Sequence, residues 1–174
     1  MPQYAPSSLR KIVLKMMQYL PTKLYLRLRY RYVFHRSLHL DNPQAYSEKL
    51  QWLKLYYHPK EYISMADKYA VKQMVAGIIG EEHVIPALGC WERPEDIEWE
   101  RLPRRFVLKT TNGGGNAGVV VCKDKAALDI PATCQRLRRA LKQDIWRENR
   151  EWHYRHIPPR ILIHLPPLRR HGTL

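Results

Sequence analysis

Apolar residues recur at helical spacing along the first half of the chain. Leu24, Tyr25, Leu28 and Tyr32 share this spacing, which predicts a helix from Thr22 to about His35. An earlier helix is expected to end near residue 20, because proline follows at position 21. The first forty residues are therefore expected to be helical.

Two more helices follow in the pattern. "DNPQAYSEKLQWLKLYY" predicts one that is capped by the residue at 41 or 42 and has Pro43 in its first turn. "ADKYAVKQMVAGIIG" predicts the other, capped by Asp67 or Ser64 and ended by Gly77 or Gly80. Both lie before the point at which the pattern changes.

The second half alternates short β-type runs with turn residues. "HVIPALGCW", "FVLK", "GVVVC" and "RILI" predict strands, and "PATCQRLRRALKQDIW" predicts one helix between the last two. We expect "FVLK" and "GVVVC" to pair antiparallel, with "TTNGGGNA" as their connection. Helices followed by strands indicate an α+β or α/β domain preceded by a basic helical segment.

The net charge of the chain indicates which classes of binding partner it favours. The chain has 174 residues and a formal net charge of +14, which favours nucleic acid, anionic lipid or phosphorylated and carboxylated ligands. The first forty residues hold eight Lys or Arg and no acid. The three cysteines show no metal-like spacing and read as reduced thiols. No signal peptide and no apolar run of about 18 residues is present, so we expect a cytoplasmic protein.

The stretch "FVLKTTNGGGNAGVVV" holds the strongest candidate chemistry. Successive glycine N–H groups can surround phosphate oxygens, and Lys109 ends the preceding strand with a positive charge. The loop would then lie over a nucleotide as a flap, although an ordinary hairpin with a long turn has the same pattern. The lysine precedes the glycines, so this is not a P-loop, and the Rossmann fingerprint is also absent.

Five motifs in order resemble the TupA-like ATP-grasp family. They are "EKLQWLKLYY", "ADKYAVK", "IGEEHVIPALGCWE", "LPRRFVLKTTNGGG" and "REWHYRHIPPRILI", and they span roughly residues 41 to 163. That family is associated with teichuronopeptide and cell-surface polysaccharide synthesis, and its members are often labelled glycosyltransferases. The resemblance implies an α+β fold in which basic helices precede the first part of an ATP-grasp fold, with antiparallel strands, a glycine-rich flap and one inserted helix.

The resemblance also implies a nucleotide site. Lys109 would bind ATP phosphates, and Lys68 and Lys72 would either support them or form a solvated face. The glycines implied as the flap are Gly113, Gly114, Gly115 and Gly118. Asn112 stands where relatives often carry histidine. The resemblance does not identify a catalytic residue.

The chain departs from the family pattern at its end. An ATP-grasp enzyme usually continues from this strand into a half that carries acidic and Asn ligands for Mg²⁺, whereas here "HLPPLRRHGTL" follows. We therefore expect a truncated member without the C-terminal half, with weak ATP binding and no catalysis. The expected division is a basic helical segment at 1–40, a helical lead-in at 41–105, a partial nucleotide-binding subdomain at 106–163 and a divergent tail at 164–174.

Three functions remain open on the sequence. The first is a fragment of an enzyme that uses ATP to join a carboxylate to an amine on an anionic polysaccharide precursor. The second is a basic nucleic-acid-binding module, although no specific nucleic-acid motif is present. The third is peripheral contact with the inner face of the membrane through residues 9–36, with Leu24, Tyr25, Leu28 and Tyr32 toward the bilayer. His35 and His39 have spacing for metal binding but no third ligand nearby, so we expect no metal site.

Overall fold

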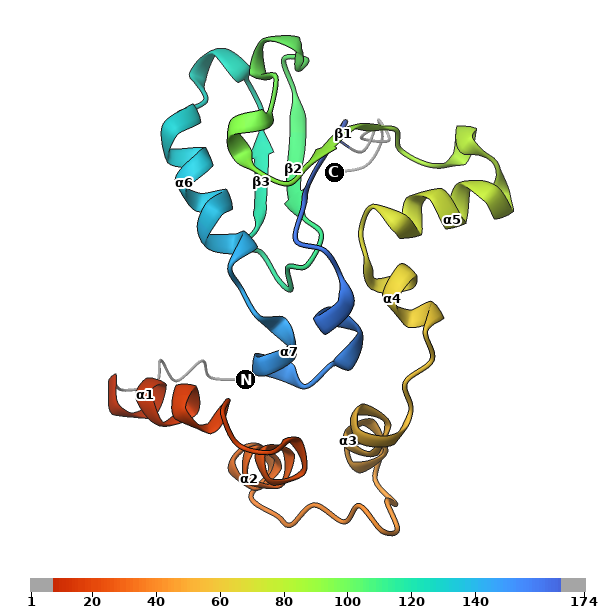
Figure 1. Ribbon diagram of the computed structural model, residues 1–174, viewed down its shortest axis with the longest axis vertical. Coiled ribbons are helices and arrows are strands. Elements are labelled where there is room, and N and C mark those ends of the chain that lie inside the picture. The colour runs from red at the N-terminus through yellow and green to blue at the C-terminus, as the bar shows by residue number, and fades with distance from the viewer. Residues whose placement is uncertain (1–7, 167–174) are drawn as a thin grey trace, which may run out of the picture. The chain divides into compact units, whose positions relative to one another are not determined.

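The computed structural model describes residues 8–166, which form an α+β protein (Figure 1). Contacts between residues divide the chain into two units. Met1–Pro59 and Trp146–Trp152 form one, here called the helical unit. Lys60–Ile145 and His153–Leu174 form the other, the sheet unit. Positions 167–174 of the predicted tail lie outside the described residues. No helix within residues 8–166 has the length and apolar character needed to cross a bilayer.

The helical unit contains α1 (Ser8–Met17), α2 (Thr22–Phe34), α3 (Tyr46–Tyr56) and the residues of α7 (Ile145–Asn149) from Trp146 onward. Its core is made by Tyr25, Leu26, Tyr30, Leu38 and Leu40. Tyr25 is only 1% exposed, so the prediction that it shares an outward face with Leu24, Leu28 and Tyr32 is wrong. The tyrosine instead takes part in packing because its ring contacts a buried arginine of the α7 segment.

That arginine is Arg150, which joins the two chain segments of the helical unit. Its guanidinium lies 4.5 Å from the ring centroid of Tyr25 and 4.9 Å from that of Trp146. It also donates hydrogen bonds to the backbone carbonyls of Gln18 (2.6 Å) and Leu20 (2.9 Å). A buried charge is stable only when it is paired or hydrogen-bonded, and these contacts supply that compensation.

The sheet unit is built around four antiparallel strands in the order β1 (Ala87–Trp91), β4 (Ile161–His164), β2 (Phe106–Thr110) and β3 (Val119–Cys122). Its helices are α4 (Glu61–Ala66), α5 (Ala70–Ile79) and α6 (Ile130–Leu141). Short 3₁₀ segments connect these elements: η1 (Glu81–His83), η2 (Pro94–Asp96), η3 (Trp99–Arg101), η4 (Lys125–Ala127) and η5 (Trp152–His156).

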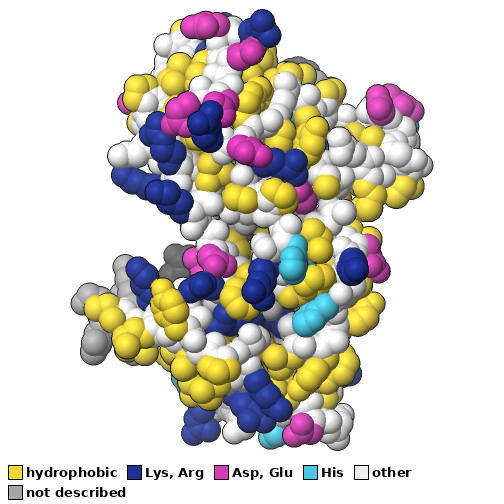
Figure 2. Space-filling view, viewed as in Figure 1, with side chains coloured by type: hydrophobic (Ala, Val, Ile, Leu, Met, Phe, Trp, Pro, Cys, Tyr) yellow, Lys and Arg dark blue, Asp and Glu magenta, His cyan; other side chains and the backbone are white. Residues whose placement is uncertain are grey.

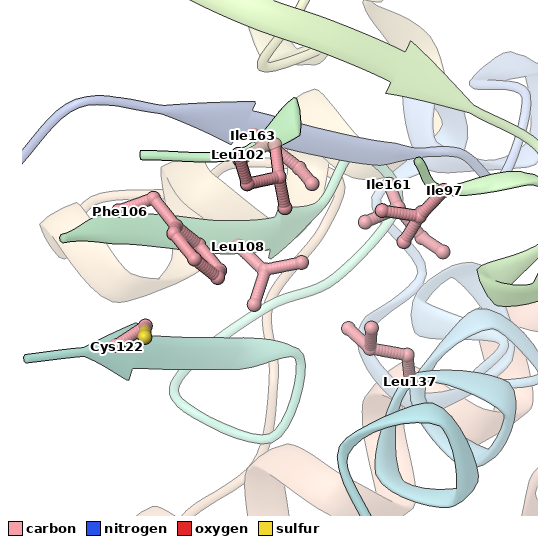
Figure 3. Close-up of a cluster of buried hydrophobic side chains, with 8 residues drawn as sticks. All are labelled: Ile97, Leu102, Phe106, Leu108, Cys122, Leu137, Ile161 and Ile163. Atoms are coloured by element: carbon pink, nitrogen blue, oxygen red, sulfur yellow. The ribbon is translucent and has the colours of Figure 1, made fainter. Parts of the chain in front are cut away.

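The predicted hairpin is confirmed. β2 pairs antiparallel with β3, with Phe106 opposite Cys122 and Lys109 opposite Val119. One face of the sheet packs on α6 through a cluster of buried side chains: Ile97, Leu102, Phe106, Leu108, Cys122, Leu137, Ile161 and Ile163 (Figure 3). Burial of each large apolar side chain of this kind stabilises the fold by about 1.5–3 kcal/mol.

The start predicted for α3 and the end predicted for α6 are wrong, whereas the cap predicted for α5 is confirmed. Glu48 accepts the N–H groups of Gln44 (3.0 Å) and Ala45 (3.1 Å), so α3 begins at Tyr46 and Pro43 lies outside it. The helix predicted over "ADKYAVKQMVAGIIG" is confirmed as α5, with Asp67 as its cap and Gly80 at its end, although Ala66 belongs to α4. The helix predicted over "PATCQRLRRALKQDIW" ends early, at Leu141, and α7 follows as a separate helix.

Candidate functional site

Lys109 lies on the sheet face that does not pack on α6. Side chains alternate along a strand, so Phe106 and Leu108 enter the core while Lys109 points to the opposite face. Its cross-strand partners are Val119 on β3 and Leu162 on β4. The side chain is half-buried at the end of β2, where the glycine-rich connection begins. This is the position that the sequence predicted for it.

The glycine loop between β2 and β3 is anchored at its first residues. The Thr111 backbone N–H donates to the carbonyl of Arg160 (2.8 Å), and the Thr111 hydroxyl donates to the carbonyl of Pro158 (2.6 Å). The Asn112 side-chain amide donates to the carbonyls of Leu141 and Gln143, at 3.2 Å each. The first part of the loop is thus tied to the segment before β4 and to the end of α6.

The glycines of the loop have two different environments. A Cβ at Gly113 or Gly118 would collide with the Thr110 hydroxyl, so both positions require glycine for a tight closure of the loop. Gly114 has room for a side chain, and Gly115, with φ of +69°, is exposed with no heavy atom within 4 Å of its Cβ position. Thr110 Oγ1 is buried and has no hydrogen-bond partner within residues 8–166. Of the four loop glycines, Gly114 and Gly115 are therefore the accessible ones.

Lys68 lies in the turn between α4 and α5 rather than inside a helix. Its ammonium donates to the backbone carbonyls of Gly113 (2.5 Å) and Thr111 (3.3 Å). The turn holds this lysine against the loop because Asp67 Oδ1 caps α5 through the N–H groups of Tyr69 (2.8 Å) and Ala70 (3.4 Å). Lys68 therefore connects the helical lead-in of the sheet unit to the glycine loop.

The carboxylate of Asp67, the residue before Lys68, already has other hydrogen-bond partners. Asp67 is 3% exposed, and its Oδ2 accepts a hydrogen bond from the Arg160 guanidinium at 2.8 Å. That guanidinium also lies 5.1 Å from the ring centroid of Tyr69. Because Asp67 is shared between an arginine and a helix cap, it compensates the Lys68 ammonium only in part.

The positive charge of Lys109 acts on both Lys68 and Lys72. Burial lowers the pKa of Lys68 and of Lys72, and the positive charge of Lys109 lowers both further. The Lys72 ammonium donates to the carbonyl of Ile85 at 2.5 Å, next to β1. Like charges held close together disfavour the protonated forms, and an anion placed among them would relieve this repulsion. These three lysines are called the lysine cluster below.

His164 also belongs to this face of the sheet. It lies opposite Val107 in the pairing of β4 with β2 and is 5% exposed, and its Nδ1 donates to the carbonyl of Leu165 at 2.6 Å. Burial lowers its pKa, and the charges of Lys109 and Lys72 lower it further, although the hydrogen bond to Leu165 raises it. The sequence interpretation missed His164, but the alternation in "ILIH" could have placed it on the same face as Lys109.

A hollow of about 490 Å³ lies between α5 and the chain that enters β1. Lys72 lines it, so the hollow adjoins the lysine cluster. The other lining residues are mostly apolar or small: Tyr69, Gln73, Ala76, Gly77, Glu81, Val84, Ile85, Pro86 and Ala87. Such a surface can hold an uncharged, flat group beside a charged one.

The structure therefore brings the predicted site residues together only in part. Lys68, Lys72 and Lys109 converge, and Gly114 and Gly115 form the accessible part of the loop. Asn112 is 7% exposed and its amide is directed to the end of α6, while Gly113 and Gly118 close the base of the loop. No group of three or more His, Cys, Asp or Glu side chains within residues 8–166 is placed to hold a metal ion.

A lysine-ended strand, a glycine-rich hairpin and a lysine-bearing turn on one face of an antiparallel sheet define a domain suited to phosphate groups. The sequence profile of the family described as TupA-like ATPgrasp matches residues 48–165, which is well over half of the chain. The chain belongs to the TupA-like ATP-grasp family, as its motifs predicted. Neither the curated proteins nor the solved structures contain a significant match.

Proposed function

We propose that the sheet unit binds the triphosphate of ATP. The observation that supports this most directly is the lysine cluster, in which Lys68 donates to the loop carbonyls of Gly113 and Thr111 and the charge of Lys109 lowers the pKa of both Lys68 and Lys72. Asp67, the acidic neighbour of Lys68, is held by Arg160. A chain of phosphates supplies the missing negative charge, and charge-assisted hydrogen bonds to it are stronger than neutral ones.

Each residue has a distinct part in this proposal. Lys109 and Lys72 contact phosphate oxygens, and Lys68 adds charge while it keeps the loop in place through its two carbonyl contacts. The backbone at Gly114 and Gly115 approaches the phosphates because glycine leaves room for them. The hollow beside Lys72 accepts the uncharged part of the nucleotide. ATP-grasp relatives use Mg²⁺, but residues 8–166 show no ligand group for it, so we derive no step through a metal.

At the level of the reaction, we propose the family's chemistry for the complete machinery. A carboxylate oxygen attacks the γ-phosphorus of ATP, ADP leaves, and an acyl phosphate forms. An amine then attacks the acyl carbon, inorganic phosphate leaves, and an amide results. The proposed acceptor is an anionic precursor of a bacterial surface polysaccharide, handled in the cytoplasm. For the chain as given, we keep the prediction of weak ATP binding without turnover.

Calorimetric titration of ATP into the protein, with and without Mg²⁺, tests the binding. We expect ATP and inorganic tripolyphosphate to bind and adenosine to bind much more weakly. Lys109→Ala should weaken ATP binding by about 1–3 kcal/mol, or roughly 5- to 150-fold, the usual range for loss of a contact to a charged group. Lys123→Ala, at an exposed lysine beyond β3, is the matched control and should leave the affinity unchanged.

Two results would contradict the proposal. Equal affinity for adenosine and ATP would show that phosphate is not what the site recognises. An unchanged affinity in Lys109→Ala would remove this lysine from the site. Release of ADP, followed separately, tests turnover, and rapid ADP release by the purified 174-residue chain would show that the prediction of inactivity is wrong.

A further inference from the structure

The helix α2 carries both buried and exposed apolar side chains. Tyr25, Leu26 and Tyr30 are each 1–2% exposed and form the core of the helical unit. Leu24, Leu28 and Tyr32 recur every four residues on the other side and are 44%, 41% and 49% exposed. Residues four apart on a helix are neighbours, so these three form one continuous stripe. The core of the helical unit does not bury this stripe, because the α2 residues in that core are Tyr25, Leu26 and Tyr30.

Two arginines border this stripe. Arg27 and Arg31 lie one turn apart, and both are exposed. With Leu28, Ser37 and Leu38 they line a hollow of about 310 Å³ on the helical unit. Within the described residues, no ion pair involves either guanidinium. The first forty residues contain no Asp or Glu that could neutralise them.

The neighbouring helix α1 has the same combination of side chains. Ile12 and Met16 are one turn apart and 55% and 68% exposed, and Lys15 is exposed beside them. Figure 2 shows Lys and Arg side chains interleaved with hydrophobic ones over the lower part of the view, where Figure 1 places both α2 and α3. We call Ile12, Met16, Leu24, Leu28, Tyr32, Arg27 and Arg31 the α1–α2 surface. It offers apolar and cationic groups at the same time.

We propose that the α1–α2 surface docks on an anionic phospholipid leaflet. The leucines, Ile12, Met16 and Tyr32 enter the boundary between headgroups and acyl chains, while Arg27 and Arg31 take headgroup phosphates in their hollow. A second copy of the chain does not suit this surface, because two such faces would bring like charges together. Nucleic acid would engage the arginines but would leave the leucine stripe in water.

This inference is independent of ATP binding, because every residue that carries it lies in the helical unit. Failure of one proposal therefore leaves the other standing. The test uses the whole chain and vesicles of phosphatidylcholine, with or without about one third phosphatidylserine. We expect sedimentation with the anionic vesicles at low salt and little with the neutral ones. Binding should weaken as salt rises, because screening shortens the reach of surface charge.

Variants separate the contribution of the arginines to vesicle binding from that of the leucines. Arg27→Gln with Arg31→Gln should lower the fraction bound several-fold, whereas Lys49→Gln with Lys60→Gln removes the same charge elsewhere and should have a much smaller effect. Leu24→Ser with Leu28→Ser should keep some binding at low salt and lose it at physiological salt. All of these side chains are exposed, so the variants should fold, which circular dichroism checks.

Three outcomes overturn the proposal. The first is a chain that stays in the supernatant with anionic vesicles at low salt. The second is equal loss of binding in the arginine pair and in the lysine control, which would indicate attraction by net charge alone. The third is a leucine variant that binds anionic vesicles as well as the parent chain at physiological salt. The same conclusion follows if the leucine substitutions weaken binding to vesicles no more than they weaken binding to a DNA duplex.

Discussion

Thr110 determines which glycines of the loop can be replaced. Its side chain occupies the space that a Cβ at Gly118 would need, whereas a Cβ at Gly114 would meet Ile145 at an ordinary distance of 3.5 Å. We expect Gly118→Ala to lower the free energy of unfolding by about 1–3 kcal/mol, the usual cost of overpacking. Gly114→Ala should change it by less than about 0.5 kcal/mol. Urea unfolding of both variants measures the difference.

A double variant checks the cause of this loss. Thr110→Ala added to Gly118→Ala removes the colliding hydroxyl, so the pair should be less destabilised than the sum of the two single variants. Strict additivity, or equal loss in Gly114→Ala and Gly118→Ala, would show that the loop does not close on Thr110. If the loop does close on Thr110, only Gly114 and Gly115 among its glycines leave room for a side chain, and these are the positions at which a ligand would approach.

His164 should make stability depend on pH. Burial and the charges of Lys109 and Lys72 lower its pKa in the folded state below the ordinary value of 6.5. The folded state thus favours the neutral ring, and this contribution to stability is present above pH 6.5. It should be lost as pH falls from there through the lowered pKa of the folded state. His164→Gln should remove this part of the pH dependence.

Urea unfolding between about pH 5 and 7.5 measures the effect as a difference between the two proteins. The other histidines contribute equally to both curves, so only the slope due to His164 remains in the difference. Parallel curves over the whole range would contradict the prediction. A variant curve that falls more steeply with acid would contradict it as well.

At the scale of elements, Asp67 connects α5 to β4. One of its oxygens caps the helix, and the other accepts a hydrogen bond from the Arg160 guanidinium just before the strand. Asp67→Ala removes both contacts and should cost about 2–3 kcal/mol, the upper range for a hydrogen bond to a charged group. Asp67→Asn keeps a capping oxygen but loses the ion pair, so its cost should be intermediate. Urea unfolding at neutral pH gives both values.

Asp129 provides the matched control for this prediction. It caps α6 through the N–H of Ala132 (2.9 Å), and no described residue forms an ion pair with it. Asp129→Asn should therefore be nearly neutral, because asparagine is an equally good cap. If Asp67→Asn is also neutral, the ion pair with Arg160 contributes nothing and Asp67 acts only as a cap.

The hairpin and the Asp67 cap of α5 were predictable from sequence, whereas the start of α3 was not. Two β-type runs around a glycine-rich turn pair with their neighbour in sequence, so β2 and β3 follow from local pattern. Glu48 shortens α3 by binding the N–H groups of Gln44 and Ala45, which a helical pattern leaves available in either register. The family resemblance placed Asn112 in the nucleotide site, but the direction of its side chain depends on carbonyls about 30 residues away.

At the scale of the whole molecule, Arg150 holds the helical unit together. Replacement by Leu removes its hydrogen bonds to Gln18 and Leu20 and its contacts with Tyr25 and Trp146. We expect Arg150→Leu to speed amide exchange in α2 while β2 and β3 keep their protection, because the units have separate cores. Hydrogen exchange followed by mass spectrometry resolves the two regions.

Arg150→Lys is the control for charge. It keeps the positive charge but lacks the planar fork that reaches two carbonyls, so its exchange should lie between that of the parent and that of Arg150→Leu. A uniform rise in exchange across α2 and β2 would show that the two units open together and would contradict the division into separate cores.

The membership of residues 146–152 in the helical unit was beyond the reach of sequence patterns. The predicted division at residues 40 and 105 follows local composition, whereas the Arg150 contact with Gln18 spans 132 positions. A pattern of spacing describes neighbours along one helix and contains no information about such a pairing. The convergence of Lys68 with Gly113, 45 positions away, came only from the resemblance to a family.

This long-range pairing has a consequence for synthesis of the protein. Ribosomes add roughly 5–20 residues per second, so about 7 to 26 s pass between the synthesis of Gln18 and that of Arg150. During that interval the apolar sides of α1 and α2 emerge without the partner that completes their core. The basic, leucine-bearing N-terminal helices are therefore available to chaperones, or to a membrane, before the rest of the polypeptide has been made.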